Sequence, residues 1–296
     1  MVRNISPDMI NILVIGANGQ LGSELKAISA QFNDLHFTFV DIDELDISKQ
    51  DEVAEFIGRL KPKFIVNAAA YTAVDNAEVE HEMAYRVNAE AVNYIVKAAS
   101  AVNAKLIHIS TDYVFNGMSY KPYAEDDETS SNSIYGSSKL KGEEYAISSG
   151  IGMVIRTAWL YSAYGKNFMK TILTKSNDGS LKVVFDQIGS PTWAHDLALA
   201  IVHIIKYSNE VFHNEIFHYS NEGVCSWYDF AKAILSIKGR ECEVAPVLSS
   251  EFVTKAKRPH YSVLNKQKIK KTFGLIIPYW RDSLGECLSS ALLDKY

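Results

Sequence analysis

Two residues near the middle of this 296-residue chain, Tyr135 and Lys139, have side chains that could move a proton. A spacing of four residues places both on the same face of a helix. An ammonium beside a phenol favours the phenolate, which predicts a pKa of Tyr135 below its ordinary value of about 10. Such a tyrosine could exchange a proton with a carbonyl or alcohol oxygen near neutral pH. Tyr-x3-Lys also occurs by chance in surface helices, so the assignment depends on the elements around the pair.

A glycine-rich turn follows the first apolar segment of the chain. Residues 11–15 predict a buried strand, and a helical stretch begins at Ser23. Gly16, Gly19 and Gly22 lie between the two. Glycines at a strand-to-helix turn let the backbone approach a pyrophosphate, and the start of the helix offers free N–H groups. The alternative is a turn that only connects two elements, but its place after the first strand favours a dinucleotide site.

A second predicted strand, residues 36–40, ends at Asp41. In a Rossmann unit an acidic side chain here meets the adenosine ribose hydroxyls and disfavours a 2′-phosphate. Asp46 is an alternative for this contact, and a role as helix cap next to Ser48 is compatible with it. Asp41 and the lack of a basic residue in the glycine-rich turn favour NADH, while NADPH stays a candidate.

The remaining elements of the first half alternate between strand and helix. We predict strands at 63–67, 104–110 and 153–157 and helices at 48–60, 78–102 and from Ser133 onward. This alternation predicts an α/β fold of the Rossmann type, a doubly wound parallel sheet with helices on both faces. Because the carboxyl ends of parallel strands meet at one edge, Thr111 and Asp112 should lie beside the small residues 68–72.

Past about residue 160 the pattern loosens. Residues 194–207, 227–237 and 280–293 have helical periodicity, and we assign them to a smaller C-terminal lobe. Residues 1–160, with returning segments of the second half, are expected to form the dinucleotide-binding domain, and residues 161–296 mainly the lobe.

Composition excludes several classes of function. A net charge of −5 gives no basic footprint for nucleic acid, and no apolar run approaches the ~18 residues of a membrane span. Residues 1–11 are polar, without the apolar core of a signal peptide, so we expect a cytoplasmic protein. Cys225, Cys242 and Cys287 are scattered without metal-ligand spacing, which indicates free thiols in a reducing compartment.

Several motifs in order resemble the extended short-chain dehydrogenases/reductases, and among them the dTDP-4-dehydrorhamnose reductase family. They are the glycine pattern 16–22, Asn67-Ala68-Ala69, Ser110-Thr111-Asp112-Tyr113-Val114-Phe115 and Tyr135-x3-Lys139. Further matching stretches are 66–75, 156–161, 186–192 and 258–262. The likeness runs almost from end to end, and an ordered set of motifs is far more specific than any one of them.

The resemblance implies the NAD(P)H-dependent reduction of the C4 keto group of dTDP-4-dehydro-β-L-rhamnose to dTDP-β-L-rhamnose. This is the last step of dTDP-rhamnose synthesis for cell-surface polysaccharide. It assigns Tyr135 as proton donor, Lys139 as the residue that holds the nicotinamide ribose, and Thr111 as a hydrogen-bond donor to the reacting carbonyl. Related dehydratases carry an Asp-Glu pair after this threonine. Tyr113 replaces the glutamate here, which favours simple reduction.

The resemblance also implies two sets of binding residues, the second of them on the nucleotide-sugar side. For the cofactor, NADPH or NADH, they are Gly16, Asn18, Gly19, Gln20, Leu21, Gly22, Asp41, Asp46, Ile47, Ala69, Ala70, Tyr71, Thr72, Asn88, Tyr135 and Lys139. For the dTDP-sugar they are Thr111, Asp112, Tyr113, Trp159, Asn167, Gln187 and Arg258. Asn88 could instead be a buried hydrogen-bonder or a surface amide. A single Trp is more often a packing residue than a sugar platform, but the resemblance favours the site for Trp159. Arg258 could meet a diphosphate bidentately or be a lone surface charge.

Metal, oligomeric state and other activities are left open. Some rhamnose reductases are homodimers that hold magnesium with glutamates; Glu24 matches one of these, but His195 stands near the place of a second, so we do not predict a metal. The alternatives are another nucleotide-sugar 4-ketoreductase or epimerase, and a non-catalytic regulatory subunit with this fold. The intact Thr111, Tyr135 and Lys139 favour an enzyme.

Overall fold

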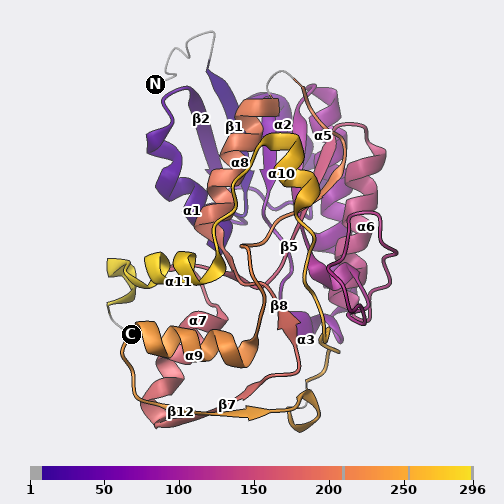
Figure 1. Cartoon of the computed structure of the whole chain (residues 1–296). Helices are drawn as coiled ribbons and strands as arrows, with labels where there is room; N and C mark the ends of the chain where they lie inside the picture. The colour runs from indigo at the N-terminus through magenta and orange to yellow at the C-terminus, as the bar shows by residue number, and fades with distance from the viewer. Residues whose placement is uncertain (1–8, 209–210, 253, 295–296) are drawn as a thin grey trace.

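A six-stranded parallel sheet forms the centre of the molecule in the computed structural model, which describes residues 9–208, 211–252 and 254–294 (Figure 1). The sheet has the order β10-β5-β4-β3-β1-β2. Its strands are β1 (Ile10–Ile15), β2 (Leu35–Val40), β3 (Phe64–Asn67), β4 (Lys105–Thr111), β5 (Gly152–Thr157) and β10 (Ile216–His218). The strand order reverses between β1 and β3. A ligand crevice is therefore expected at the carboxyl ends of these two strands. The predicted doubly wound α/β fold is confirmed.

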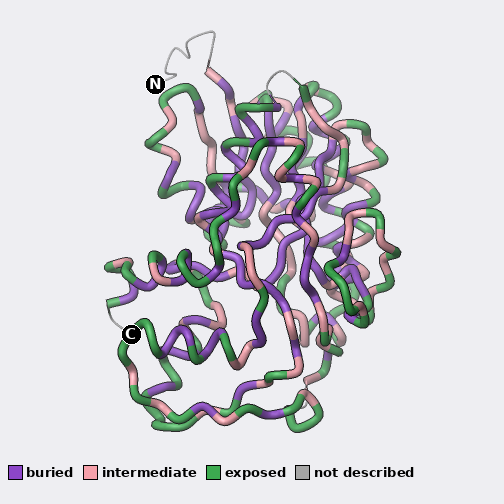
Figure 2. Tube along the Cα trace, in the orientation of Figure 1, coloured by how far each residue is buried: buried purple, intermediate pink, exposed green. Residues whose placement is uncertain are grey.

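Helices cover both faces of the sheet because its strands are apolar on both sides. In β1, Val14 packs toward α1 (Gln20–Ile28) and α8 (Ala194–Ser208). The neighbouring Leu13 packs toward α2 (Gln50–Leu60) and α5 (Ala91–Ala101). Successive side chains of a strand point to opposite faces, so each strand contributes to two cores. Figure 2 shows the sheet as the most continuously buried part of the trace.

Helix α8 lies on this sheet and not in the smaller lobe, so our assignment of residues 194–207 was wrong. Its residues Leu197, Ile201 and Ile204 join the same apolar cluster as Leu25 of α1. The cause is the sixth strand, β10, which pairs in parallel with β5 and therefore needs a crossover helix before it. Helix α10 (Gln267–Phe273) packs on the same side.

The predicted helix at 78–102 is interrupted. The chain forms α3 (Val74–Ala77), α4 (His81–Tyr85), a π-helical segment at Arg86–Glu90 and then α5. A π-helical turn inserts one residue into the ladder of hydrogen bonds and often marks a functional site. Helix α6 (Ile134–Ser148) packs directly against this segment.

The smaller lobe lies below the carboxyl edge of the sheet in Figure 1. It is built around α7 (Phe168–Lys175), α9 (Trp227–Ile237) and α11 (Trp280–Leu288), which share an apolar core. Its strands are β6 (Leu160–Tyr161), β7 (Ser180–Val184), β8 (Ile188–Gly189), β9 (Thr192–Trp193), β11 (Cys225–Ser226) and β12 (Glu243–Val247). The predicted helix at 280–293 ends at Leu288, and a 3₁₀ turn follows at Ala291–Leu293. The helix at 227–237 is confirmed.

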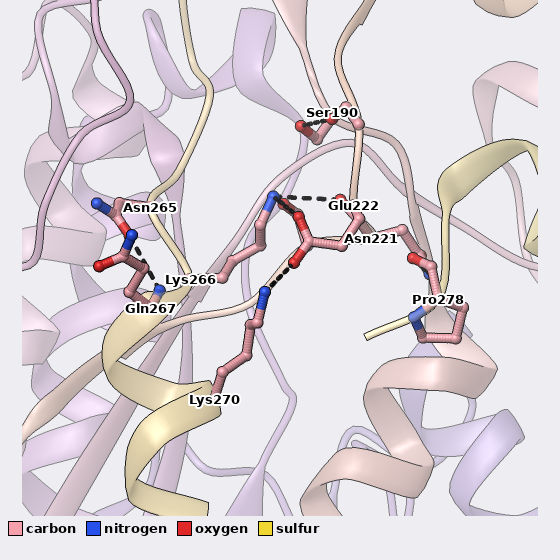
Figure 3. Close-up of polar contacts among 10 residues, drawn as sticks. Ser190, Asn221, Glu222, Asn265, Lys266, Gln267, Lys270 and Pro278 are labelled. Atoms are coloured by element: carbon pink, nitrogen blue, oxygen red, sulfur yellow. Dashed lines mark hydrogen bonds and ion pairs between the residues drawn. The ribbon is translucent and has the colours of Figure 1, made fainter. Parts of the chain in front are cut away.

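Charged side chains connect the start of α10 to the segment that follows β10 (Figure 3). Glu222 accepts a hydrogen bond from Lys270 Nζ at 2.7 Å and pairs with Lys266 Nζ at 3.4 Å. The neighbouring Asn221 donates through Nδ2 to the Asp196 carboxylate at 2.6 Å. Asp196 lies in the first turn of α8, and Ser283 of α11 donates to the same carboxylate oxygen. This network fixes α11 to the segment after β10.

No described helix is long and apolar enough to cross a membrane. Residues 1–8, most of the segment in which a signal peptide was sought, lie outside the described residues. The three cysteines are free thiols, as predicted.

Candidate active site

Thr111 and Tyr135 meet at the carboxyl edge of the sheet. Thr111 ends β4, and Tyr135 lies in the first turn of α6. The helix begins there because Ser133 Oγ accepts a hydrogen bond from the Gly136 N–H at 3.1 Å. The Thr111 hydroxyl lies close enough to Tyr135 to lower the pKa of the phenol, and it donates to Asp112 Oδ1 at 3.0 Å. The hydroxyl oxygens of Thr111 and Tyr135 are therefore placed to hydrogen-bond the same carbonyl oxygen of a substrate.

Burial raises the pKa of Tyr135 well above its usual value, and this outweighs the lowering by Thr111. Our prediction that Lys139 lowers this pKa is therefore wrong for this structure. Lys139 Nζ instead donates to the backbone oxygen of Ile109 at 2.6 Å and lies 3.3 Å from His108 Nε2. Burial lowers the pKa of Lys139 to about 8. Tyr135 is thus a protonated phenol at neutral pH, the form that a proton donor needs.

The glycine-rich turn has the shape of a pyrophosphate cradle. Gly16 has φ +86°, and a Cβ there would come within 2.6 Å of the Ala69 backbone nitrogen. A Cβ on Gly22 would collide with Gly16 O. Helix α1 begins at Gln20 with Gly19 as its N-cap, so no capping side chain takes up its first N–H groups. These groups suit an anionic ligand, whereas the Leu21 side chain is buried in the core behind them.

Asp41, and not Asp46, lies against this turn. Its Oδ2 accepts a hydrogen bond from the Asn18 N–H at 2.7 Å. Asp46 accepts from the N–H and hydroxyl of Ser48, which lower its pKa. The N-cap of α2 is Lys49, so Asp46 forms a turn before the helix and is not its cap. Ile47 beside it is buried.

Asn88 is fully buried and connects the segment 68–72 to α6, so the surface-amide alternative was wrong. Its Oδ1 accepts from the Tyr71 N–H at 2.8 Å, and its Nδ2 donates to Tyr71 O at 3.1 Å and Ser138 Oγ at 3.0 Å. Ser138 Oγ in turn donates to Tyr135 O at 2.8 Å. The amide thus fixes the backbone beside Tyr135. Ala69, Ala70 and Tyr71 are half-buried at the edge of the sheet, and Thr72 is exposed.

Arg258 connects the C-terminal half to the catalytic edge. Its Nη2 pairs with Asp75 Oδ2 at 2.6 Å, and its Nη1 donates to the Tyr113 hydroxyl at 3.3 Å. The Tyr113 ring meets Tyr135 edge to face at 5.5 Å between centroids. Burial raises the pKa of Asp112 to about 6. Sequence reasoning missed Asp75, although it ends one of the matching stretches.

A cavity of about 540 Å³ opens beside Arg258. Gln187 also lines it and donates through Nε2 to Ser249 Oγ at 2.9 Å. One acidic side chain and several basic, apolar and hydroxyl side chains share its wall: Asp186, Leu248, Ser249, Ser250, Phe252, Thr254, Lys255, Lys257 and His260. This wall could hold an anionic ligand that also has an apolar part.

Two of the expected substrate residues have partners within the protein. Trp159 stacks on Trp227 at 3.5 Å between centroids, and it does not line the cavity. The Asn167 side chain caps α7 and donates through Nδ2 to Gln20 Oε1 at 2.9 Å. Asn167 therefore ties the lobe to the first residue of α1.

Glu24 and His195 do lie together, but they do not fit a magnesium site. Glu24 is buried; it accepts from Ser162 Oγ at 2.6 Å, and its other oxygen lies 3.4 Å from His195 Nδ1. The hydrogen bond to Glu24 raises the pKa of His195. Both carboxylate oxygens thus have partners, and the described residues include no cluster of three side chains that could bind a metal.

A set of buried polar side chains near Lys139 was missed by sequence reasoning. Arg156 of β5 is bidentate with Glu143 of α6, and both are 2% exposed. His108 of β4 is fully buried between Asn67 and Lys139. The available signal was a histidine or an arginine in the middle of an otherwise apolar strand.

The fold and site together define an extended short-chain dehydrogenase/reductase, an oxidoreductase of the Rossmann type. The model of the RmlD substrate binding domain family matches residues 10–293, and the chain belongs to this family. The resemblance on which the sequence was interpreted is confirmed.

Three similar proteins illustrate the match. The spore coat polysaccharide biosynthesis protein SpsK of Bacillus subtilis is 38% identical, over 95% of this chain and 97% of its own. A dTDP-4-dehydrorhamnose reductase structure from Clostridium acetobutylicum has a TM-score of 0.89 at 38% identity, over 94% of this chain and 98% of that one. Another, from Bacillus anthracis in complex with NADP, has a TM-score of 0.88 at 36% identity, over 95% and 99%.

Proposed function

We propose that this protein is an enzyme that reduces the C4 keto group of dTDP-4-dehydro-β-L-rhamnose to dTDP-β-L-rhamnose, with NADPH or NADH as reductant. The observation that carries the proposal is the pair of neighbouring side chains Thr111 and Tyr135 at the carboxyl edge of the sheet, together with the glycine-rich turn at the same edge. The similarity of the protein to dTDP-4-dehydrorhamnose reductases over nearly the whole chain supports the choice of substrate.

The site residues divide the work of this reduction. Thr111 hydrogen-bonds the keto oxygen, and Tyr135, which burial keeps protonated, gives it a proton. The nicotinamide cofactor supplies the hydride. Lys139, one turn further along α6, would hold the cofactor ribose. Tyr113 stands where related dehydratases have a glutamate, so the site lacks the extra base that water elimination needs.

The cofactor would lie along the switch point between β1 and β3. The cradle at Gly16 and Gly22 and the free N–H groups of α1 suit its pyrophosphate, and Asp41 suits the adenosine ribose. The segment 69–72 forms the neighbouring wall. Asn88 supports the segment 69–72 from within the protein, while Asp46 holds the turn before α2 and Ile47 beside it is buried. Asp41 favours NADH, whereas the similar Bacillus anthracis protein binds NADP.

The dTDP-sugar would occupy the cavity beside Arg258, whose Nη1 donates to the Tyr113 hydroxyl. Gln187 and Arg258 line this cavity, and the Arg258 guanidinium suits a diphosphate. In this proposal Trp159 and Asn167 act through packing and capping, behind the substrate. Residues 1–160 with α8 and β10 form the cofactor domain, and most of residues 161–296 form the nucleotide-sugar lobe. We expect a cytoplasmic enzyme that binds neither nucleic acid nor membrane.

The test is to incubate the purified protein with NADPH or NADH and a panel of 4-keto sugar nucleotides. Oxidation of the cofactor is monitored by the absorbance of the reduced nicotinamide. We expect turnover with the dTDP-4-keto-rhamnose substrate. Tyr135→Phe should abolish turnover but still bind cofactor, because it loses only the proton donor. The matched control is Tyr145→Phe in the same helix, which should keep its activity. Absence of turnover with this substrate by the wild-type protein would refute the proposal.

A further inference from the structure

One carboxylate, that of Asp75, holds two points of a loop that forms part of the cavity wall. Asp75 lies in α3, shortly after the segment 69–72 that is assigned to the cofactor. Its Oδ1 accepts a hydrogen bond from the Ala256 N–H at 3.0 Å, and its Oδ2 binds Arg258 Nη2 at 2.6 Å. Ala256 and Arg258 both line the cavity of about 540 Å³. The two oxygens of Asp75 therefore fix the backbone and the guanidinium of this loop together.

The guanidinium of Arg258 has a second partner, which leads to the catalytic tyrosine. Its Nη1 donates to the Tyr113 hydroxyl at 3.3 Å, and the Tyr113 ring meets Tyr135 edge to face. A guanidinium has more N–H groups than these two bonds use, so it can also bind a diphosphate bidentately. Asp75 thus orients the guanidinium and leaves donors for a ligand.

The residues that follow Arg258 are fixed independently of Asp75. A Cβ on Gly117 would collide with Pro259 Cβ, so the loop after β4 lies directly against this segment. The Tyr261 N–H also donates to Gly117 O at 3.0 Å. Loss of Asp75 would therefore free the guanidinium without detaching the whole segment.

The ion pair of Asp75 and Arg258 lies where it contributes little to folding. The side chain of Asp75 is 38% exposed and that of Arg258 is 24% exposed. Water reaches both groups, and ion pairs of this kind have small effects on stability. The geometry of the pair, and not its contribution to the free energy of unfolding, is therefore its main consequence for the cavity.

We propose that Asp75 is a positioning residue for the nucleotide-sugar, because it sets the orientation in which Arg258 meets the diphosphate and thereby the place of the sugar relative to Tyr135. This inference rests on the substrate proposed above. The alternative role of the carboxylate is to reduce the positive charge of the cavity wall, which carries lysine and histidine side chains beside Arg258. The two roles predict opposite effects. Removal of a neutralising charge strengthens the binding of an anion, whereas removal of a positioning contact weakens it.

The test is the binding of dTDP to the whole protein, measured by titration calorimetry without cofactor. Asp75→Asn keeps an oxygen for the Ala256 N–H and turns its NH₂ group toward the guanidinium, so it removes only the ion pair. We expect the Kd for dTDP to rise roughly 3- to 10-fold, because binding must then immobilise the freed Arg258 side chain. A Kd that is unchanged or lower in this variant would overturn the proposal.

Two controls isolate the contact with Arg258. Glu82→Gln in α4 removes an exposed carboxylate and changes the net charge by the same amount, so it should leave the Kd for dTDP unchanged. Arg258→Met should itself weaken dTDP binding, and adding Asp75→Asn to it should have no further effect. An equal rise in Kd on adding Asp75→Asn to Arg258→Met would contradict the role assigned to Asp75.

Stability and kinetics distinguish positioning from a purely structural role. Because the pair is exposed, Asp75→Asn should unfold at the same urea concentration as the wild type. If the proposed reaction holds, KM for the sugar nucleotide should rise and kcat should fall, because the keto group is presented to Tyr135 from a shifted position. A rise in KM with an unchanged kcat, or weaker binding that accompanies lower stability, would overturn the positioning role.

The result for Asp75 is separate from the result for the proposed reaction, since dTDP binding is measured without reductant or turnover. If the wild type binds dTDP but does not reduce the 4-keto sugar nucleotide, the proposed function fails and the inference about Asp75 stands. If the wild type does not bind dTDP, or binds it no better than Arg258→Met does, the inference is overturned.

Discussion

The buried ion pair between Arg156 and Glu143 gives the sharpest prediction for stability. The guanidinium makes bonds of 3.0, 3.1 and 2.7 Å to the carboxylate, and both side chains are 2% exposed. Arg156→Met leaves the carboxylate buried without its partner, which costs about 3–5 kcal/mol of unfolding free energy. For a chain of this size that corresponds to a fall in Tm of roughly 10 °C.

The double variant tests the reasoning. Arg156→Met with Glu143→Leu removes both charges and keeps apolar volume beside the Phe115 ring, over which the guanidinium lies at 5.0 Å. Buried pairs can often be replaced in this way at little cost, so most of the stability should return. His218 Nε2, 3.4 Å from Nη1, loses a donor, and a deficit of about 1–2 kcal/mol should remain.

Urea unfolding followed by circular dichroism measures both variants near neutral pH. The control is Lys141→Met, which breaks the pair with Glu144 in the same helix; that pair is exposed, so little change is expected. If the double variant is as unstable as Arg156→Met alone, the cost does not come from an uncompensated charge and the argument fails.

Two further predictions concern the residues around Tyr135. Asn88→Leu should lose about 2–3 kcal/mol of unfolding free energy and weaken cofactor binding, because it leaves the Tyr71 backbone without partners; Asn93→Leu in α5 is the control, and equal stability of the two would contradict the role given to Asn88. The raised pKa of Asp112, about 6 against 3.8, means that the folded state binds its proton more tightly. Its contribution to stability is complete below pH 4 and is lost as the pH rises to about 6, so the wild type should lose about 3 kcal/mol relative to Asp112→Asn over this window. If the difference in unfolding free energy between the wild type and Asp112→Asn is the same at pH 4 and at pH 6, this assignment is refuted.

Local signals were sufficient to predict most of the sheet. β1, β3, β4 and β5 are short apolar runs that end in small or polar residues, and the predicted bounds agree to within a residue or two. The packing partner of a helix is not a local property. The periodicity of α8 is the same whether it faces the sheet or the lobe, and only β10, beyond its end, decides between them.

The candidate site was predictable where spacing alone determines geometry. The glycine spacing implied close backbone contacts, and Gly16 does lie against Ala69. The four-residue spacing of Tyr135 and Lys139 predicted that they share a helix face. It could not predict that the Lys139 ammonium would donate to Ile109 O on β4 instead of facing the Tyr135 hydroxyl.

Contacts between distant segments could not be read from the sequence. Arg258 pairs with Asp75, which lies 183 residues earlier in the chain, and Trp159 stacks on Trp227 of α9. Asn88 reaches Tyr71 from a π-helical turn whose extra residue leaves no local signature in the sequence.

The ion pair between Asp75 and Arg258 also bears on how the enzyme is made. At about 5–20 residues per second, a ribosome needs roughly 10–40 s to add the 183 residues that separate them. Thr111, Tyr135 and Lys139 are synthesised early in this interval, β10 late in it and Arg258 at its end. The nascent chain therefore exposes an unpaired β5 edge and an incomplete site until the last part of translation. Premature termination before Ile216 should yield an inactive chain with an open sheet edge, a substrate for chaperones and proteases.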